Sequence, residues 1–132
     1  MHISASVRNS RATHEVTVSS GDSLKTLDIP GRAMGFGSSV NGGEFLMLAL
    51  ATCYCNDLYR EAARLQIGID SVEVEASADF EGIGLAAANI RYRAKVVSLS
   101  SDADVARLLQ ETDAVAEIHN TLRTGVAVLR DS

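Results

Sequence analysis

The sequence has few cysteines and no stretch that resembles a leader segment. Cys53 and Cys55 are the only two thiols among its 132 residues. The N-terminal residues 1–6 lack both the basic region and the apolar region of a signal peptide, so we expect a cytoplasmic protein. Because the cytoplasm keeps thiols reduced, we expect both cysteines to be free rather than joined in a structural disulfide.

A surplus of basic residues and a long apolar run are also missing. Twelve Lys and Arg stand against 17 Asp and Glu, and they are scattered, so no basic stripe exists to neutralise the phosphates of a nucleic acid. The longest apolar run, residues 45–55, is about half of what a bilayer requires, which predicts a core helix and no membrane association. The length fits one domain, residues 1–132, with an N-terminal hairpin region of about residues 1–40 completing the fold.

The apolar run belongs to a long predicted helix. Asn41 can cap its first turn, and Glu44, three residues later, can bond back to Asn41. An amphipathic pattern continues to Leu65, and Gly68 is the expected stop. The helix should therefore run for about 22 residues, or about 33 Å at the α-helical rise.

Alternating apolar and polar residues predict strands on both sides of this helix. Residues 3–7 and 13–19 should form a hairpin with Asn9 and Ser10 in its turn, and residues 24–29 a third short strand. The Gly-rich loop from Gly31 to Gly43 has two open interpretations: a functional loop, or a connector that needs glycine for its turns.

Residues 72–80 and 90–96 predict a second antiparallel pair, folded about Gly84. That register sets Glu75 opposite Arg93 and Glu73 opposite Lys95, so these charges should have a structural, solvent-facing role.

The C-terminal third predicts a further helix and a final strand. Ser101 to Asp104 resembles a capping box, and apolar spacing extends the helix at least to Glu111. The pattern leaves open whether the helix breaks near Asp113 and resumes over residues 114–122. Gly125 suits a stop, followed by a strand over residues 126–129. The order βββ-α-ββ-α-β predicts an α+β fold with antiparallel sheets packed on the long helix.

These residues resemble the OsmC/Ohr superfamily of osmotically inducible and organic-hydroperoxide-resistance proteins over essentially the full chain. The segment Gly43–Cys53 is similar to the family pattern Pro-Gly-Glu-Leu-Leu-Leu-(x)-Ala-Leu-Ala-(x)-Cys, at its usual Glu-to-Cys spacing. Residues 63–74 resemble the family's passage from the long helix to a strand, and residues 120–126 resemble the stretch that follows its second cysteine.

The resemblance implies an intertwined homodimer that reduces small organic hydroperoxides, without a cofactor, at two interface sites. By position, the peroxidatic residue would be Cys53, the carboxylate Glu44 and the arginine Arg8, with Arg11 a weaker choice. A thiolate is the nucleophile in such chemistry, and a guanidinium lowers the thiol pKa and stabilises the departing oxygen.

Helix geometry adds a constraint to this carry-over. Glu44 and Cys53 lie nine residues apart, about 13–14 Å along one helix and half a turn out of phase, so a dimer must supply one of them to a shared site. Simpler roles stay open for both: Glu44 as part of a helix cap and Cys53 as a small buried apolar residue.

The family's second cysteine has no counterpart here, because its position falls on Ala116. Cys55 cannot replace it, since residues two apart on a helix point in nearly opposite directions. Reduction of an oxidised Cys53 would need an external thiol. His119, near the lost position, is a speculative binding or base residue, or simply a surface histidine. Cys53, Cys55 and His119 do not converge as zinc ligands, so we expect no metal.

Three function classes follow. The first is a one-cysteine, thiol-dependent hydroperoxide reductase of the oxidative or osmotic stress response. The second is a non-catalytic dimer that binds a small apolar ligand in its interface pocket. The third is a structural or stress-associated dimer without a site.

Overall fold

The structure is a computed structural model that describes residues 1–131. Its helices and strands follow the chain in this order: β1 (Ile3–Asn9), β2 (His14–Ser20), β3 (Ser23–Leu27), α1 (Gly42–Leu65), β4 (Ser71–Asp79), β5 (Ala88–Val97), α2 (Asp102–Val115) and α3 (Glu117–Thr124). The chain divides into two compact units, Met1–Phe45 and the part from Leu46 onward. The α+β class with antiparallel sheets is confirmed. No helix among the described residues is both long and apolar enough to span a bilayer.

The first unit is a three-stranded antiparallel sheet in the order β1-β2-β3. The predicted hairpin is present, with Asn9 paired to His14 at its end and Val7 paired to Val16. The third strand is also present, although it starts and ends slightly earlier than expected. Its register on β2 pairs Thr17 with Thr26.

Helix α1 begins at the predicted capping box. The backbone N–H of Glu44 donates to the Asn41 side chain at 2.8 Å, and the Asn41 backbone N–H donates to the Glu44 carboxylate at 3.0 Å. These reciprocal bonds satisfy two of the N–H groups that the first turn of a helix leaves without intrahelical partners. The start of α1 therefore follows from local sequence chemistry.

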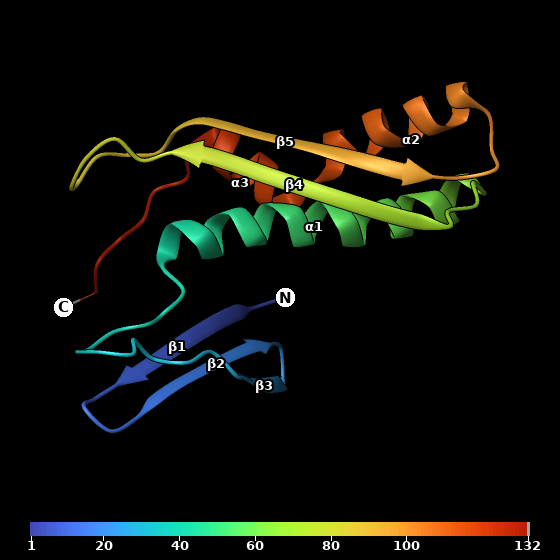
Figure 1. The fold of residues 1–132 in the computed structure, drawn as a ribbon. Helices are drawn as coiled ribbons and strands as arrows, with labels where there is room; N and C mark the ends of the chain where they lie inside the picture. Colours follow the sequence, from blue (N-terminus) through green and yellow to red (C-terminus); the bar gives the residue numbers. More distant parts are fainter. Residues whose placement is uncertain (132) are drawn as a thin grey trace. The chain divides into compact units, whose positions relative to one another are not determined.

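The second unit packs its helices on one face of the β4–β5 ribbon (Figure 1). The predicted register is confirmed, because Glu73 pairs with Lys95 and Glu75 with Arg93. Alternation places these charges outward, while the opposite face packs on the core. That core joins residues of α1, α2 and the ribbon: Tyr54, Leu58, Ala62, Ile67, Leu108 and Ala116, with Val72, Val74, Tyr92, Ala94 and Val96 packed against them.

The end of α1 differs from the prediction. The stop occurs at Gln66, not at Gly68, and Gln66 adopts a left-handed φ of 58°. Its N–H donates to the Ala63 carbonyl at 3.3 Å, and the Ile67 N–H donates to the Ala62 carbonyl at 2.9 Å. This pair of bonds is a Schellman cap, which usually has glycine at the left-handed position. The prediction from the glycine preference therefore placed the end of the helix two residues too late.

The C-terminal region also corrects the predicted order. The helical pattern is broken once, at the extended residue Ala116, which separates α2 from α3. The predicted final strand over residues 126–129 is wrong, because Val126, Val128 and Leu129 are 63%, 98% and 84% exposed and outside any strand. A strand needs a neighbouring backbone to satisfy its N–H and C=O groups, and alternation of side chains does not supply one.

The cap at Gln66 yields a stability prediction. Gln66→Gly should raise the free energy of unfolding by about 0.5–1 kcal/mol, because a side chain in the left-handed region is strained. The measurement is urea unfolding of the whole chain. Gly125→Ala is the matched comparison, since Gly125 has φ 64° and no heavy atom within 4 Å of an added Cβ. In Gly125→Ala the free energy of unfolding should fall by about 1 kcal/mol. A Gln66→Gly variant less stable than the parent would contradict this explanation of the helix end.

Candidate functional site

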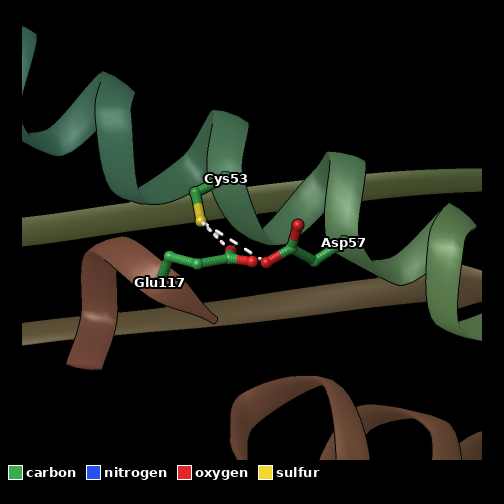
Figure 2. Close-up of side chains that lie close together, drawn as sticks. All are labelled: Cys53, Asp57 and Glu117. Carbon is green, nitrogen blue, oxygen red and sulfur yellow. Dashed lines mark hydrogen bonds between the residues drawn. The ribbon is translucent and has the colours of Figure 1, made fainter. Parts of the chain in front are cut away.

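Cys53 lies on α1 with its sulfur facing two carboxylates (Figure 2). The sulfur is 3.5 Å from Asp57 Oδ2, one turn along the same helix, and 3.8 Å from Glu117 Oε2, at the start of α3. A single S–H can donate to only one of these oxygens at a time. Cys53 is a free, half-buried cysteine.

Arg60 holds the two carboxylates in place. Its Nη1 lies 3.1 Å from Asp57 Oδ1 and 3.1 Å from Glu117 Oε1. In each carboxylate, one oxygen therefore lies beside the guanidinium, and the other oxygen faces the thiol. Cys53, Asp57 and Arg60 follow one another at spacings of four and three residues, which places them on one face of α1.

A buried carboxylate extends this network to α2. Glu61 accepts from Arg60 Nε at 3.3 Å and from Arg64 Nε at 3.0 Å. Arg64 Nη2 in turn reaches Glu111 Oε2 on α2 at 3.1 Å. The hydrogen bond from Arg64 is the main reason that the pKa of Glu61 is lowered. Glu61 therefore stays ionised between two guanidinium groups.

The environment of Cys53 favours the protonated thiol. Burial is the main cause that raises its pKa, and the charges of Asp57 and Glu117 raise it further, against a lowering contribution from the Ile118 backbone amide. Burial also raises the pKa of Asp57, with Glu117 adding to the effect. The pKa of Glu117 is lowered instead, by a backbone N–H and by its bond with Asp57. Asp57 is therefore the weaker acid of the pair and the better proton acceptor beside the thiol.

The three donor atoms could also surround a cation. Cys53 Sγ and one oxygen each of Asp57 and Glu117 all lie within 4.8 Å of one another. The Arg60 guanidinium already supplies a positive charge to both carboxylates. The cluster therefore has its own counter-ion, and it is best described as a thiol beside two carboxylates.

His119 is buried among aromatic rings rather than exposed at a helix end. It is 3% exposed, and its ring centroid lies 4.4 Å from that of Tyr92 and 5.7 Å from that of Tyr54. Neither ring nitrogen has a hydrogen-bond partner among the described residues. Burial is the main cause that lowers its pKa, followed by the charge of Arg123. His119 thus stays neutral near pH 7 and packs as an aromatic residue.

The other residues expected in the site have different local partners. Glu44 is engaged in the cap with Asn41. The Arg8 side chain is 82% exposed and lies 3.9 Å from Glu15 on the neighbouring strand. Ala116 is fully buried in the core against which Cys53 packs. Within the described chain, the polar side chains on the Cys53 sulfur are therefore Asp57 and Glu117.

Three residues of this cluster were not predicted from the sequence: Asp57, Arg60 and Glu117. A usable signal existed for two of them, because Asp57 and Arg60 follow Cys53 at helical spacing on an amphipathic helix. Glu117 gave no such signal, since it reaches the sulfur only after the chain turns at Ala116. The site therefore combines a local pattern with one tertiary contact.

A cavity lies between α1 and the β4–β5 ribbon. Its volume is about 780 Å³, and its apolar lining includes Met47, Leu48 and Ala51 of α1 with Val74 and Tyr92 of the strands. Cavities of this size accommodate small organic molecules.

The buried His119 predicts an acid-sensitive stability. Its folded-state pKa is below the ordinary value, so the unfolded chain binds a proton more readily. The His119 contribution should be complete above about pH 6.5 and should decrease as the pH falls below that value, by at most about 1.4 kcal/mol per pH unit. His119→Phe keeps an aromatic ring and should flatten the pH dependence of unfolding between pH 7 and 5.

The control for this prediction is His2→Gln, because His2 is exposed outside any helix or strand. This variant should keep the slope of the parent chain. An equal slope in His119→Phe and the parent would show that His119 does not control the acid response.

Comparison with known proteins identifies the family. The model of the family described as OsmC-like protein matches residues 35–129. A search of curated proteins finds no match. Among solved structures, an OsmC-like protein from Mycoplasma pneumoniae is 22% identical, with a TM-score of 0.61 over 92% of this chain and 86% of that one.

Two further structures are organic hydroperoxide resistance proteins. The one from Legionella pneumophila is 15% identical, with a TM-score of 0.61 over 93% of this chain and 90% of that one. The one from Elizabethkingia anophelis is also 15% identical, with a TM-score of 0.63 over 93% and 89%. These similarities concern the fold, whereas the family model matches well over half of the sequence. The chain therefore belongs to the OsmC-like protein family.

Proposed function

We propose that this OsmC-like protein is a thiol-dependent organic hydroperoxide reductase of one-cysteine type. The observation that carries the proposal is the half-buried, free Cys53 thiol 3.5 Å from Asp57, a carboxyl group whose pKa is raised. Such a carboxyl can accept the thiol proton during attack and return it to the leaving oxygen. Two of the structural neighbours are described as organic hydroperoxide resistance proteins, which supports this proposal.

The first step oxidises Cys53 and reduces the hydroperoxide. The sulfur attacks the terminal oxygen of ROOH, the O–O bond breaks, and a sulfur–oxygen bond forms. Asp57 takes the thiol proton as the sulfur becomes nucleophilic, and a proton passes to the departing alkoxide. The products are the sulfenic acid of Cys53 and one molecule of ROH, so protons and electrons balance.

Recovery requires a reductant from outside the chain. Ala116 occupies the position of the family's second cysteine, and Cys55 lies on the same helix only two residues from Cys53. A first external thiol forms a mixed disulfide with Cys53 and releases water. A second external thiol then attacks this disulfide, regenerates the Cys53 thiol and leaves as the oxidised reductant.

The proposal includes a homodimer. Glu44 and Cys53 stand nine residues apart on α1, about 13–14 Å along its axis, so a shared site needs Glu44 from a second copy. Arg8 would enter the site in the same way and would supply the guanidinium that stabilises the departing oxygen.

The direct test is consumption of cumene hydroperoxide with dithiothreitol as the reductant. Cys53→Ser should abolish thiol-dependent consumption, because it removes the nucleophile. Cys55→Ser is the matched control on the same helix and should retain the parent rate. Absence of consumption by the parent protein, or an equal rate in Cys53→Ser, would rule out the proposal.

Asp57→Asn separates proton transfer from simple ionisation in the same experiment. Loss of the Asp57 charge should lower the Cys53 pKa and speed alkylation by iodoacetamide at pH 7. Loss of the proton-transferring group should instead slow hydroperoxide reduction, by about 100-fold. Acceleration of both reactions would show that Asp57 takes no part in the proton transfer.

A second candidate function rests on the cavity of about 780 Å³ beside α1. In this case the protein binds a small apolar ligand there without catalysis, and the protonated state of Cys53 has no chemical consequence. The apolar residues Met47, Leu48 and Ala51 would contact the ligand.

Binding of the fluorescent apolar probe N-phenyl-1-naphthylamine tests the second candidate. Ala51→Trp should weaken binding about tenfold, because the larger side chain fills part of the cavity. Cys53→Ala should leave the affinity unchanged. Equal binding by the parent and Ala51→Trp would place the probe elsewhere and contradict this function.

A further inference from the structure

The first unit contains a small polar cavity that the proposed chemistry does not use. Its volume is about 210 Å³, and its lining comes only from residues 9–14, at the β1–β2 turn, and from residues 31–37, in the Gly-rich loop. Two arginines and a histidine belong to this lining: Arg11, Arg32 and His14. No acidic side chain is among the lining residues. The cavity is therefore a local concentration of positive charge in a protein whose net charge is −5.

The two arginines are not neutralised by neighbouring acids. Among the described residues, neither Arg11 nor Arg32 forms an ion pair. The Arg11 guanidinium lies over the Phe36 ring, 5.9 Å from its centroid. Arg32 runs beside Gly37, where a Cβ would stand 3.5 Å from Arg32 Nε. Both guanidinium groups keep donors available for a bound group.

The hydrogen-bond network around His14 assigns the tautomer of its neutral ring. The Gly37 backbone N–H donates to Asn9 Oδ1 at 3.0 Å, which fixes the orientation of the Asn9 amide. Asn9 Nδ2 therefore donates to His14 Nδ1 at 2.9 Å. With Nδ1 as the acceptor, the ring proton lies on Nε2. Among the described residues this buried Nε2 has no hydrogen-bond partner.

The two segments that form the cavity are fixed to each other. Asn9 bonds both the N–H and the carbonyl of Gly37, and the Arg32 N–H donates to the Gly37 carbonyl at 2.9 Å. Gly31 packs so closely on His14 that an added Cβ would lie 3.3 Å from the His14 Cβ. Gly37 has a φ of 102°, which glycine adopts far more readily than other residues. The glycines of this loop thus shape a defined cavity.

We propose that this cavity binds the phosphate group of a small phosphorylated molecule. Two guanidinium groups match the double negative charge of a phosphate monoester, and the planar donor fork of arginine suits its oxygens. No carboxylate among the lining residues opposes the anion. This proposal concerns binding only and does not depend on hydroperoxide chemistry.

Calorimetric titration of the full chain with inorganic phosphate and with phenyl phosphate tests the site, at constant ionic strength. Both probes should bind saturably, and acetate should bind at least tenfold more weakly because it carries one charge. Arg11→Gln and Arg32→Gln should each weaken phosphate binding by about tenfold or more. Both side chains lie on exposed residues, so both variants should fold, as their thermal unfolding would verify.

Lys25→Gln is the matched control, because it removes one positive charge from β3 outside the cavity lining. It should bind phosphate within twofold of the parent. Absence of saturable phosphate binding, equal binding of acetate, or an equal loss in Lys25→Gln would overturn the proposal. The experiment measures only phosphate binding, so its outcome does not depend on whether the protein reduces hydroperoxides.

Discussion

The packing of α1 on the inner face of the β4–β5 ribbon is the constraint on which the second unit depends. Tyr54, Leu58 and Ala62, each four residues apart, form the buried stripe of the helix. Once this stripe is fixed, the adjacent face of α1 has only one orientation, and it carries Cys53, Asp57 and Arg60. The position of the thiol is therefore a consequence of core packing rather than of any contact that the thiol makes.

The charges around Cys53 differ from what the family resemblance implies for an active thiol. An arginine beside sulfur stabilises a thiolate, whereas here two carboxylates face the sulfur and Arg60 is bonded to their far oxygens. The network keeps the thiol protonated while placing a proton acceptor beside it. The arrangement favours a protonated thiol with a nearby proton acceptor over a preformed thiolate.

Local rules explain which parts of the fold the sequence could predict. The Asn41–Glu44 cap and the pairing of Glu75 with Arg93 depend on neighbours in sequence or on a hairpin register, and both are present. The prediction of the final strand was wrong because a strand needs a neighbouring backbone, and the alternation of side chains does not show whether one is present. The predicted end of α1 was wrong because Gln66 adopts the left-handed backbone conformation, which is most common for glycine. Glu117 was missed for a similar reason, since the turn at Ala116 brings it to the sulfur.

Glu61 links the thiol site to helix α2 through two arginines. This buried carboxylate holds Arg60 on one side and Arg64 on the other, and Arg64 continues to Glu111 of α2. Without its charge, two guanidinium groups one helical turn apart would repel each other, and Arg60 would lose the bond that orients it toward Asp57 and Glu117. The ion pairs that position Arg60 beside Asp57 and Glu117 thereby form one continuous network with the contact between α1 and α2.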